Sequence, residues 1–196
     1  MTARTSMTDL LATLRGLAGA GSAEYTVNGS TYWTDDQLQT VLDRHVYAVR
    51  HEELRPLETY GAGGSVTYVD YQSNRRFFET VLAGTPTTRF VIQDETGAAV
   101  GTAAFTVDYP RGLVTFGTAT AGLSRYVTGY SYDLNSAAAD VWTQKAAHYV
   151  TAYDVSTDNH NLRRSQIIAG CMTMTKEYSS GAMVYSVTVE RGDTER

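Results

Sequence analysis

The sequence contains little cysteine, no excess of basic residues and no long apolar run, and each shortage excludes a class of protein. Its single cysteine, Cys171, has no partner for a disulfide within the chain. The 16 Lys and Arg residues are outnumbered by 21 Asp and Glu residues, giving a net charge of -5, whereas proteins that bind free DNA carry a basic excess. Apolar runs stay well short of the roughly 20 residues that span a bilayer. We therefore expect a soluble protein that binds neither free DNA nor a membrane.

A signal for export is also missing from the sequence. Residues 1–30 hold no basic stretch followed by an apolar stretch, so we expect synthesis in the cytoplasm without export. With 196 residues, the chain is long enough for one core with an inserted module and too short for two large domains.

Tyrosine, by contrast, is abundant, with 14 copies against 2 Trp and 5 Phe. Its side chain combines apolar area with a polar hydroxyl, which suits half-buried strands and wet protein interfaces. The composition thus favours a protein that binds other proteins.

Helical periodicity marks four segments of the chain. The first is predicted to begin with Thr8 as its N-cap and to end at Gly19. The second opens with a capping box over Thr34–Gln37, and its apolar stripe, which includes His45, extends the prediction to Leu54. The predicted helices are Thr8–Ala18, Thr34–Leu54, Ser136–Tyr153 and Arg164–Tyr178.

About seventy residues with a turn-rich β pattern separate the second helix from the third. The predicted strands are Val66–Tyr71, Phe77–Leu82, Arg89–Gln93, Ala103–Val107, Leu113–Phe116 and Ser124–Tyr132. They are short, and tight turns such as Asp94–Gly97 and Asp108–Gly112 leave no room for crossover helices. We therefore predict a mainly antiparallel sheet, as a small sandwich or an open barrel.

Two shorter features complete the pattern. A hairpin is predicted over Tyr25–Tyr32, where Asn28-Gly29 separates two β-like runs. A polar loop is predicted over Asp154–Asn161, between the last two helices.

The predicted fold class is α+β, with a small helical bundle platform, an inserted β module and an extended C-terminal tail. The platform comprises residues 1–60 and 134–181, the insertion residues 61–133, and the tail residues 182–196. Apolar residues alternate in the tail at Met183, Tyr185, Val187 and Val189. An isolated strand needs a partner sheet, so we expect this one to pair with another chain.

No group of side chains forms a recognisable catalytic or metal-binding motif. His45, His51, His148 and His160 lack the spacing of zinc ligands, and His45 is interpreted as a core histidine. Cys171 lies on an apolar helical stripe without an activating base, which favours a buried thiol.

Three carboxylates were weighed as a hydrolytic pair, namely Asp94, Glu95 and Asp108. All three fall where hairpin turns favour Asp or Asn, so a turn role is the preferred interpretation. The glycine-rich run Gly61–Ser65 lacks the Lys-Ser/Thr ending of a phosphate loop and is predicted to be a linker. We predict no catalytic residue, no metal and no cofactor.

Several segments, taken in their order along the chain, resemble the neck adaptors of tailed bacteriophages, also called head-tail connectors or head completion proteins. Three of these segments are Asp140–Ala147, Tyr153–Asp158 and Arg164–Gln166. Neck adaptors likewise pair two helices around a polar loop in this order. The similarity extends to Trp33–Leu38 at the start of the second helix. The strand pair Val107–Phe116 and Gly129–Asp133 is also similar to an insert of some phage neck proteins.

The resemblance implies a non-enzymatic virion protein, made in the host cytoplasm, that forms a dodecameric ring beneath the portal at the head-tail junction. Its implied partners are the portal protein, stopper or tail proteins and other copies of itself. Genomic DNA is expected to pass through the channel without specific binding, and the acidic charge balance favours such sliding. The residues expected to bind partners are Met183, Tyr185, Val187, Val189, Arg163 and Arg164.

Two alternatives remain open at this point. A neighbouring structural role, as a head-closure stopper or a tail-end protein, is compatible with the same segments. From another class, a carbohydrate-binding or adhesin module is compatible with the many tyrosines, because aromatic faces stack on sugars.

Overall fold

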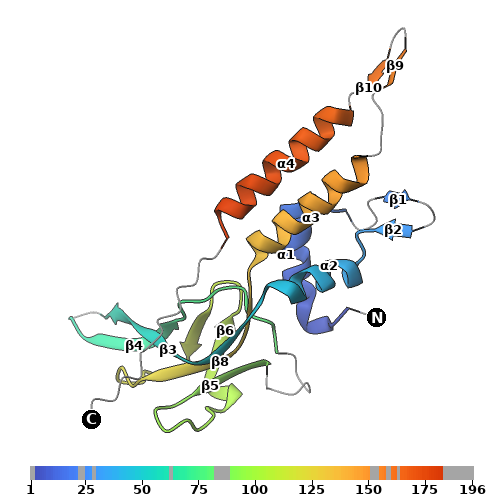
Figure 1. Cartoon of the computed structure of the whole chain (residues 1–196). Helices are drawn as coiled ribbons and strands as arrows, with labels where there is room; N and C mark the ends of the chain where they lie inside the picture. The colour runs from blue at the N-terminus through green and yellow to red at the C-terminus, as the bar shows by residue number, and fades with distance from the viewer. Residues whose placement is uncertain are drawn as a thin grey trace, which may run out of the picture.

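The computed structural model describes residues 3–21, 25–27, 30–61, 64–81, 89–150, 155–157, 160–162 and 164–182. In this part of the chain it has four α-helices and a six-stranded antiparallel sheet, which confirms the predicted α+β class. The helices are α1 (Thr8–Ala18), α2 (Asp35–Leu42), α3 (Leu134–Tyr149) and α4 (Arg164–Ser180). They gather at one end of the molecule and the sheet forms the other (Figure 1).

The sheet is one curled layer, a half-barrel, rather than a two-layer sandwich. Its strands are β3 (Val46–Tyr60), β4 (Val66–Gln72), β5 (Phe90–Gln93), β6 (Phe105–Asp108), β7 (Leu113–Phe116) and β8 (Arg125–Tyr132). They run in the order β5-β8-β3-β4-β7-β6, and every neighbouring pair is antiparallel, as predicted. Strands β5 and β6 are therefore the two edges of the sheet.

The predicted start of α2 agrees with the observed cap, whereas α3 begins at Leu134, before the predicted Ser136. The hydroxyl of Thr34 accepts from the backbone of Gln37, and the Gln37 side chain accepts in return from the Thr34 backbone, so the capping box of α2 is confirmed. A carboxylate oxygen of Asp133 accepts from the backbones of Asn135 and Ser136 and caps α3. Thr8 is the first residue of α1 rather than its N-cap, because a 3-10 turn, η1 (Thr5–Met7), precedes it.

The prediction that the second helix extends to Leu54 is wrong. Helix α2 ends at Leu42, a 3-10 turn, η2 (Asp43–His45), follows, and Val46 begins the long strand β3. Val49 fits the helical spacing, but its side chain and that of Leu54 are buried in the sheet because β3 pairs with β4 and β8. Residues 46–60, assigned to the helical platform, therefore belong to the sheet.

Two further expectations need correction. The segment expected as a strand from Phe77 forms only an isolated bridge between Phe78 and Ser131, and Leu82 lies outside the described residues. The predicted polar loop contains a short hairpin of β9 (Val155–Thr157) and β10 (His160–Leu162). The other predicted hairpin is confirmed, with β1 (Tyr25–Val27) antiparallel to β2 (Ser30–Tyr32).

Two separate apolar cores hold these layers. One lies among α1, α2 and α3 and includes Met7, Leu14, Leu38, Leu42 and Val141. The other lies on the buried face of the sheet and includes Leu54, Tyr71, Phe78, Ile92 and Val114. The chain passes from helices to sheet after η2 and returns after β8, and these two passages lie side by side because the backbone N–H of Asp133 donates to the carbonyl of His45 at 3.0 Å.

Candidate interaction surfaces

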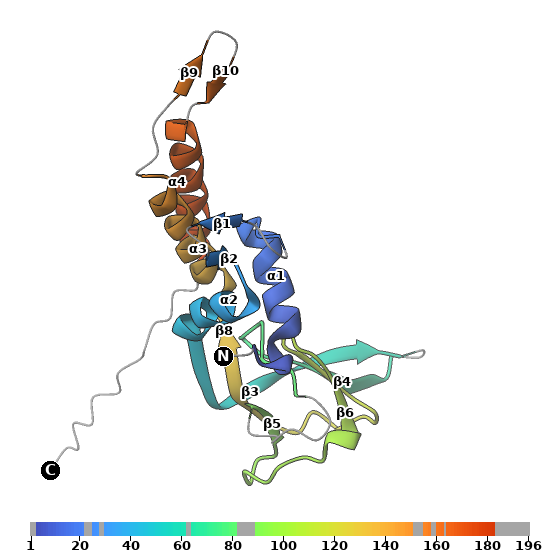
Figure 2. The ribbon, with the colours of Figure 1, turned by 90° about the vertical axis from the view of Figure 1, so that its right-hand side faces the viewer.

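Helix α4 lies along the outer side of α3, antiparallel to it, and α3 is its main neighbour in the described structure (Figures 1 and 2). Among the described side chains of α4, only Cys171 is buried, which confirms the expected buried thiol. Ile168, Met174 and Tyr178 are half-buried on the same side. On the opposite side of α4, Ala169, Thr173 and Lys176 are exposed.

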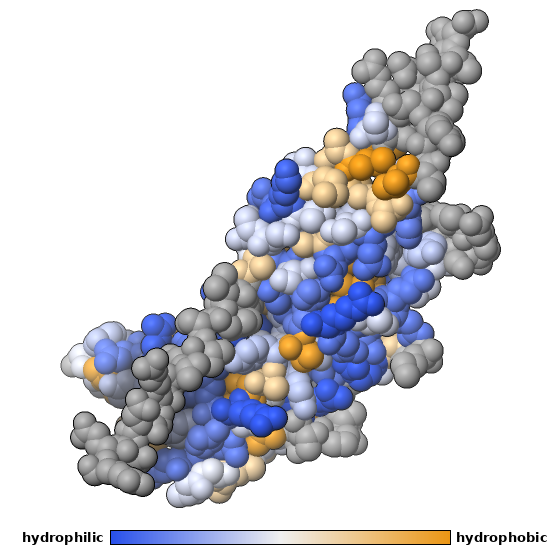
Figure 3. All heavy atoms as spheres, viewed as in Figure 1, coloured by the Kyte–Doolittle hydropathy of each residue, from blue (hydrophilic) through white to orange (hydrophobic). Residues whose placement is uncertain are grey.

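The first half of α4 exposes apolar side chains and carries little charge. Ile167 is 40% exposed and Met172 is 42% exposed, and at the same end of the helix pair Val150 is 67% exposed. We call these three residues the distal apolar patch. Figure 3 shows apolar residues gathered over this end of α4. From Ser165 onward, the helix has only two charged residues, Lys176 and Glu177, whereas a solvated helix face normally carries many charges.

The structure describes only one of the residues that the sequence analysis expects to bind partners. Arg164 is the first residue of α4. Arg163, Met183, Tyr185, Val187 and Val189 lie outside the described residues, so their role stays a prediction. Ala182, the first residue of the predicted tail and the last described residue, follows α4 after Gly181.

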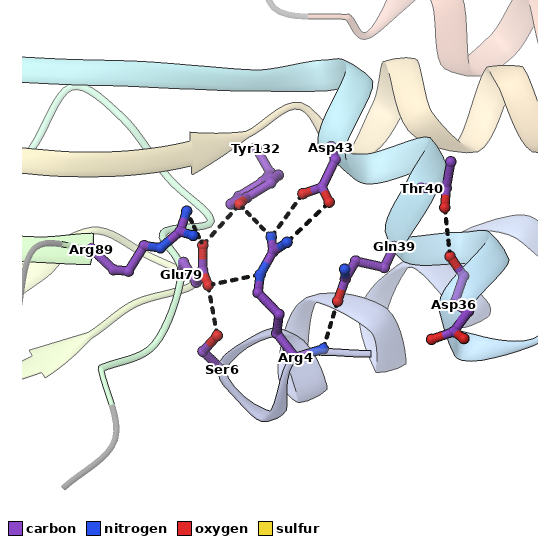
Figure 4. Close-up of polar contacts among 9 residues, drawn as sticks. All are labelled: Arg4, Ser6, Asp36, Gln39, Thr40, Asp43, Glu79, Arg89 and Tyr132. Carbon is purple, nitrogen blue, oxygen red and sulfur yellow. Dashed lines mark hydrogen bonds and ion pairs between the residues drawn. The ribbon is translucent and has the colours of Figure 1, made fainter. Parts of the chain in front are cut away.

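A buried polar junction lies between the helices and the sheet, centred on Glu79, whose residue exposure is 0% (Figure 4). Ser6 and Tyr132 donate hydroxyl hydrogen bonds to its carboxylate at 2.6 Å and 2.9 Å. The guanidinium groups of Arg4 and Arg89 lie 3.3 Å and 3.5 Å from it. A buried carboxylate is tolerated when it is paired and hydrogen-bonded in this way.

Arg4 connects this carboxylate to the helices. Its two terminal nitrogens donate to Asp43 at 3.0 Å and 2.7 Å, and its backbone N–H donates to the side-chain oxygen of Gln39 at 2.6 Å. The hydrogen bond with Asp43, followed by the attraction of Glu79, raises the pKa of Arg4, so this guanidinium stays charged. Burial, reinforced by the charge and hydrogen bond of Glu79, raises the pKa of Tyr132 above its ordinary value.

The three carboxylates weighed as a hydrolytic pair are not brought together. Asp94 follows edge strand β5 and Asp108 ends the opposite edge strand β6, while Glu95 is exposed in the turn after Asp94. Asp94 accepts from Thr96 and Ala98 within its own turn, and the Thr96 hydroxyl in particular lowers its pKa. Asp108 accepts from the backbone of Arg111. Asp94 and Asp108 therefore stabilise turns, as predicted.

His45, His51 and His148 each contact side chains of other residue types. The Nε2 atom of His45 lies 2.8 Å from Asp140 and links η2 to α3. His45 is partly exposed, so its interpretation as a core histidine is wrong. His51 stacks on Tyr126 with ring centroids 4.1 Å apart, and His148 packs against Tyr32 and Trp33. Among the residues placed in the structure, no three His, Cys, Asp or Glu side chains cluster as metal ligands do. Within the same residues, no helix has the length and apolar character needed to cross a membrane.

Sequence reasoning missed the Glu79 junction. The only hint was a charged residue directly after the apolar pair Phe77-Phe78, and nothing linked it to Arg4, 75 positions earlier.

Comparison with known proteins adds no further guide, since no protein-family model and no curated protein matches this chain.

Proposed function

We propose that this chain is a non-enzymatic structural virion protein, a head-to-tail adaptor made in the host cytoplasm. Its copies form a ring, a dodecamer on the resemblance stated above, under the portal at the head-tail junction. The ring joins the DNA-filled capsid to the next neck or tail component. The observation that carries this proposal is the distal apolar patch on α4. Exposed Ile and Met on a weakly charged helix are typical of a surface that an assembly covers.

In the proposed ring, α1 to α3 form the helical platform and α4 supplies a contact to the neighbouring subunit. Rings are built from heterologous contacts, in which one surface of a subunit meets a different surface of the next. An apolar face at one side of the platform meets this requirement, because it need not match itself. The stable core under α3 gives that face a rigid support.

The C-terminal tail is the proposed docking element toward the portal or a neighbouring subunit. It leaves α4 at Ala182, and its alternating residues Met183, Tyr185, Val187 and Val189 suit the addition of a strand to a partner sheet. Arg163 and Arg164, at the start of α4, are proposed to meet acidic partner groups. The net charge of -5 supports a channel through which DNA slides without specific binding.

The patch is tested by its effect on assembly, measured by analytical ultracentrifugation with and without purified tailless heads. We expect the wild-type chain to assemble into rings, alone or on the heads, and the double variant Ile167→Glu, Met172→Glu to remain monomeric. Leu123→Glu is the matched control, because Leu123 is an equally exposed apolar residue in a turn of the sheet region. Equal assembly of the double variant and the control would remove the patch from the proposal.

A stopper or tail-end role would use the same patch and differs from the adaptor in its place on the particle.

The carbohydrate-binding alternative has one observation in its favour. On the β3–β4 hairpin, the hydroxyl groups of Tyr60 and Tyr68 both donate to Glu58, and Tyr60 is strongly exposed. Two aromatic rings beside a carboxylate are suited to stacking and hydrogen bonding with a sugar. A glycan array decides between the classes, because an adaptor is expected to bind none of its sugars.

A further inference from the structure

The passages between helices and sheet have the geometry of a hinge. Within the described residues the chain crosses between the two parts only at His45–Val46 and at Tyr132–Leu134. These crossings are neighbours, since Val46 pairs with Tyr132 and the Asp133 N–H donates to the His45 carbonyl. Two adjacent connections at element ends allow rotation about one axis unless other contacts prevent it.

Residues 3–7 supply polar contacts against this rotation, in addition to the apolar packing of Phe77, Tyr130 and Tyr132 on the helical core. Met7 is fully buried in the helical core, which anchors the segment to the helices. Ahead of it, Ser6 and Arg4 reach across to Glu79 on the sheet side, and the backbone N–H of Thr80 donates to the Ser6 carbonyl at 3.3 Å. Glu79 is itself fixed to the sheet, because its own N–H donates to the Tyr130 carbonyl at 3.0 Å. Figure 4 shows Arg4 between the two parts, with Asp43 and Gln39 on one side and Glu79 on the other.

We infer that residues 3–7 form a strap that locks a hinge between the helices and the sheet through its contacts with Glu79. Four side chains donate to or pair with the Glu79 carboxylate, and two of them belong to the strap, namely Arg4 and Ser6. When the strap leaves, the carboxylate of Glu79, which is 0% exposed in the closed structure, keeps only Tyr132 and Arg89 as side-chain partners. An ionised carboxylate in that state is unstable until water reaches it, and water reaches it when the two parts separate. Release of the strap and opening of the hinge are therefore one coupled event.

The coupling gives the fold a built-in means of changing the angle between α3–α4 and the sheet. The trigger is the removal of Arg4 from Glu79 and Asp43, by a competing acidic group or by displacement of the N-terminal segment. This inference stands independently of the proposed function, because it concerns the free 196-residue chain and invokes no portal, ring or tail.

Hydrogen exchange followed by mass spectrometry tests the lock. In Arg4→Ala, we expect the amides of residues 77–81 and 130–134 to exchange faster by about tenfold or more, because a buried charged group loses its partner. Peptides from β7 and the core face of α1 should keep their wild-type rates. Arg15→Ala is the matched control, since Arg15 pairs with Asp35 at 2.6 Å entirely within the helices. It should leave residues 77–81 and 130–134 unchanged.

Two results would overturn the inference. Equal exchange in Arg4→Ala and wild type would show that the strap does not hold the hinge. Uniformly faster exchange across the chain would show that Arg4 contributes general stability rather than a lock. If Arg4→Ala does not fold, Ser6→Ala removes a single strap contact and is judged by the same criterion, with a smaller expected increase at the same amides.

Discussion

The ammonium nitrogen of Lys145 lies 2.8 Å from the carbonyl oxygen of Ala18, so a lysine of α3 caps the C-terminal end of α1. The same group lies 3.3 Å from the Gly19 carbonyl and 4.5 Å from the centre of the Trp142 ring. The Trp142 indole N–H donates to the Leu17 carbonyl at 3.2 Å. The last carbonyls of α1, which no residue of α1 can satisfy, are thus satisfied by two side chains of α3.

Replacing Lys145 should therefore separate α1 from α3. We expect Lys145→Met, which keeps the apolar stem, to lower the free energy of unfolding by about 1–3 kcal/mol, because buried carbonyls lose a charged donor. Urea denaturation followed by circular dichroism measures this change. Lys176→Met on the exposed side of α4 is the control and should change stability by less than about 0.5 kcal/mol. Equal stability of the two variants would exclude the capping role.

Gly112 permits a close contact that no other residue allows. It has φ +65°, and a Cβ there would lie 2.1 Å from the Arg75 carbonyl oxygen. Gly97 has a similar φ of +82° but open space around its Cβ position. We predict that Gly112→Ala lowers the free energy of unfolding by more than about 3 kcal/mol and Gly97→Ala by about 1 kcal/mol, since only the first adds a backbone clash. Similar losses in the two variants, measured by urea denaturation, would contradict the packing of the β6–β7 turn on residues 73–78.

The raised pKa of Tyr132 predicts that the stability of the fold depends on pH in the alkaline range. Its pKa is raised in the folded chain, so its stabilising contribution is fully present below the ordinary tyrosine pKa of about 10. That contribution is lost as the pH rises above about 10, because the unfolded state releases this proton first. We expect the free energy of unfolding to fall more steeply between pH 9 and pH 11, roughly the range around that pKa, in wild type than in Tyr132→Phe. Parallel curves from urea titrations at several pH values would show that Tyr132 does not contribute.

The C-terminal tail is predicted to be needed for docking and not for folding. Deletion of residues 182–196 should leave the melting temperature unchanged, because the described cores end before this segment. The same deletion should abolish binding to purified tailless heads, measured by co-sedimentation. A matched variant with serine at Met183, Tyr185, Val187 and Val189 tests the alternating residues at full length. Undiminished binding by both variants would rule out the tail as the docking element.

The sequence predicts local structure well where a signal is local. The capping box at Thr34, the Asn-Gly hairpin and the strand Leu113–Phe116 are all found as expected, because capping and turn chemistry act over a few residues. The antiparallel arrangement also follows from short connections alone.

The failures arise where tertiary contacts decide. Val49 continues a helical stripe from α2, yet the neighbouring β-branched and aromatic residues pair with β8, and this pairing overrides the helical period. The Glu79 junction joins residues from positions 4 to 132, and no sequence spacing encodes such a contact. For the predicted helix Arg164–Tyr178, the sequence does not show that Ile167 and Met172 stay 40% and 42% exposed, because this depends on α4 packing mainly on α3.

Antibody labelling of intact source particles and of their tailless heads, viewed by negative-stain electron microscopy, tests the central claim most directly. The adaptor role predicts label confined to the head-tail junction of intact particles. It also predicts label at the portal vertex of heads that retain the protein. Label at a tail tip or fibre would contradict the adaptor role and favour the adhesin alternative, and the absence of label from every particle would contradict a virion role altogether.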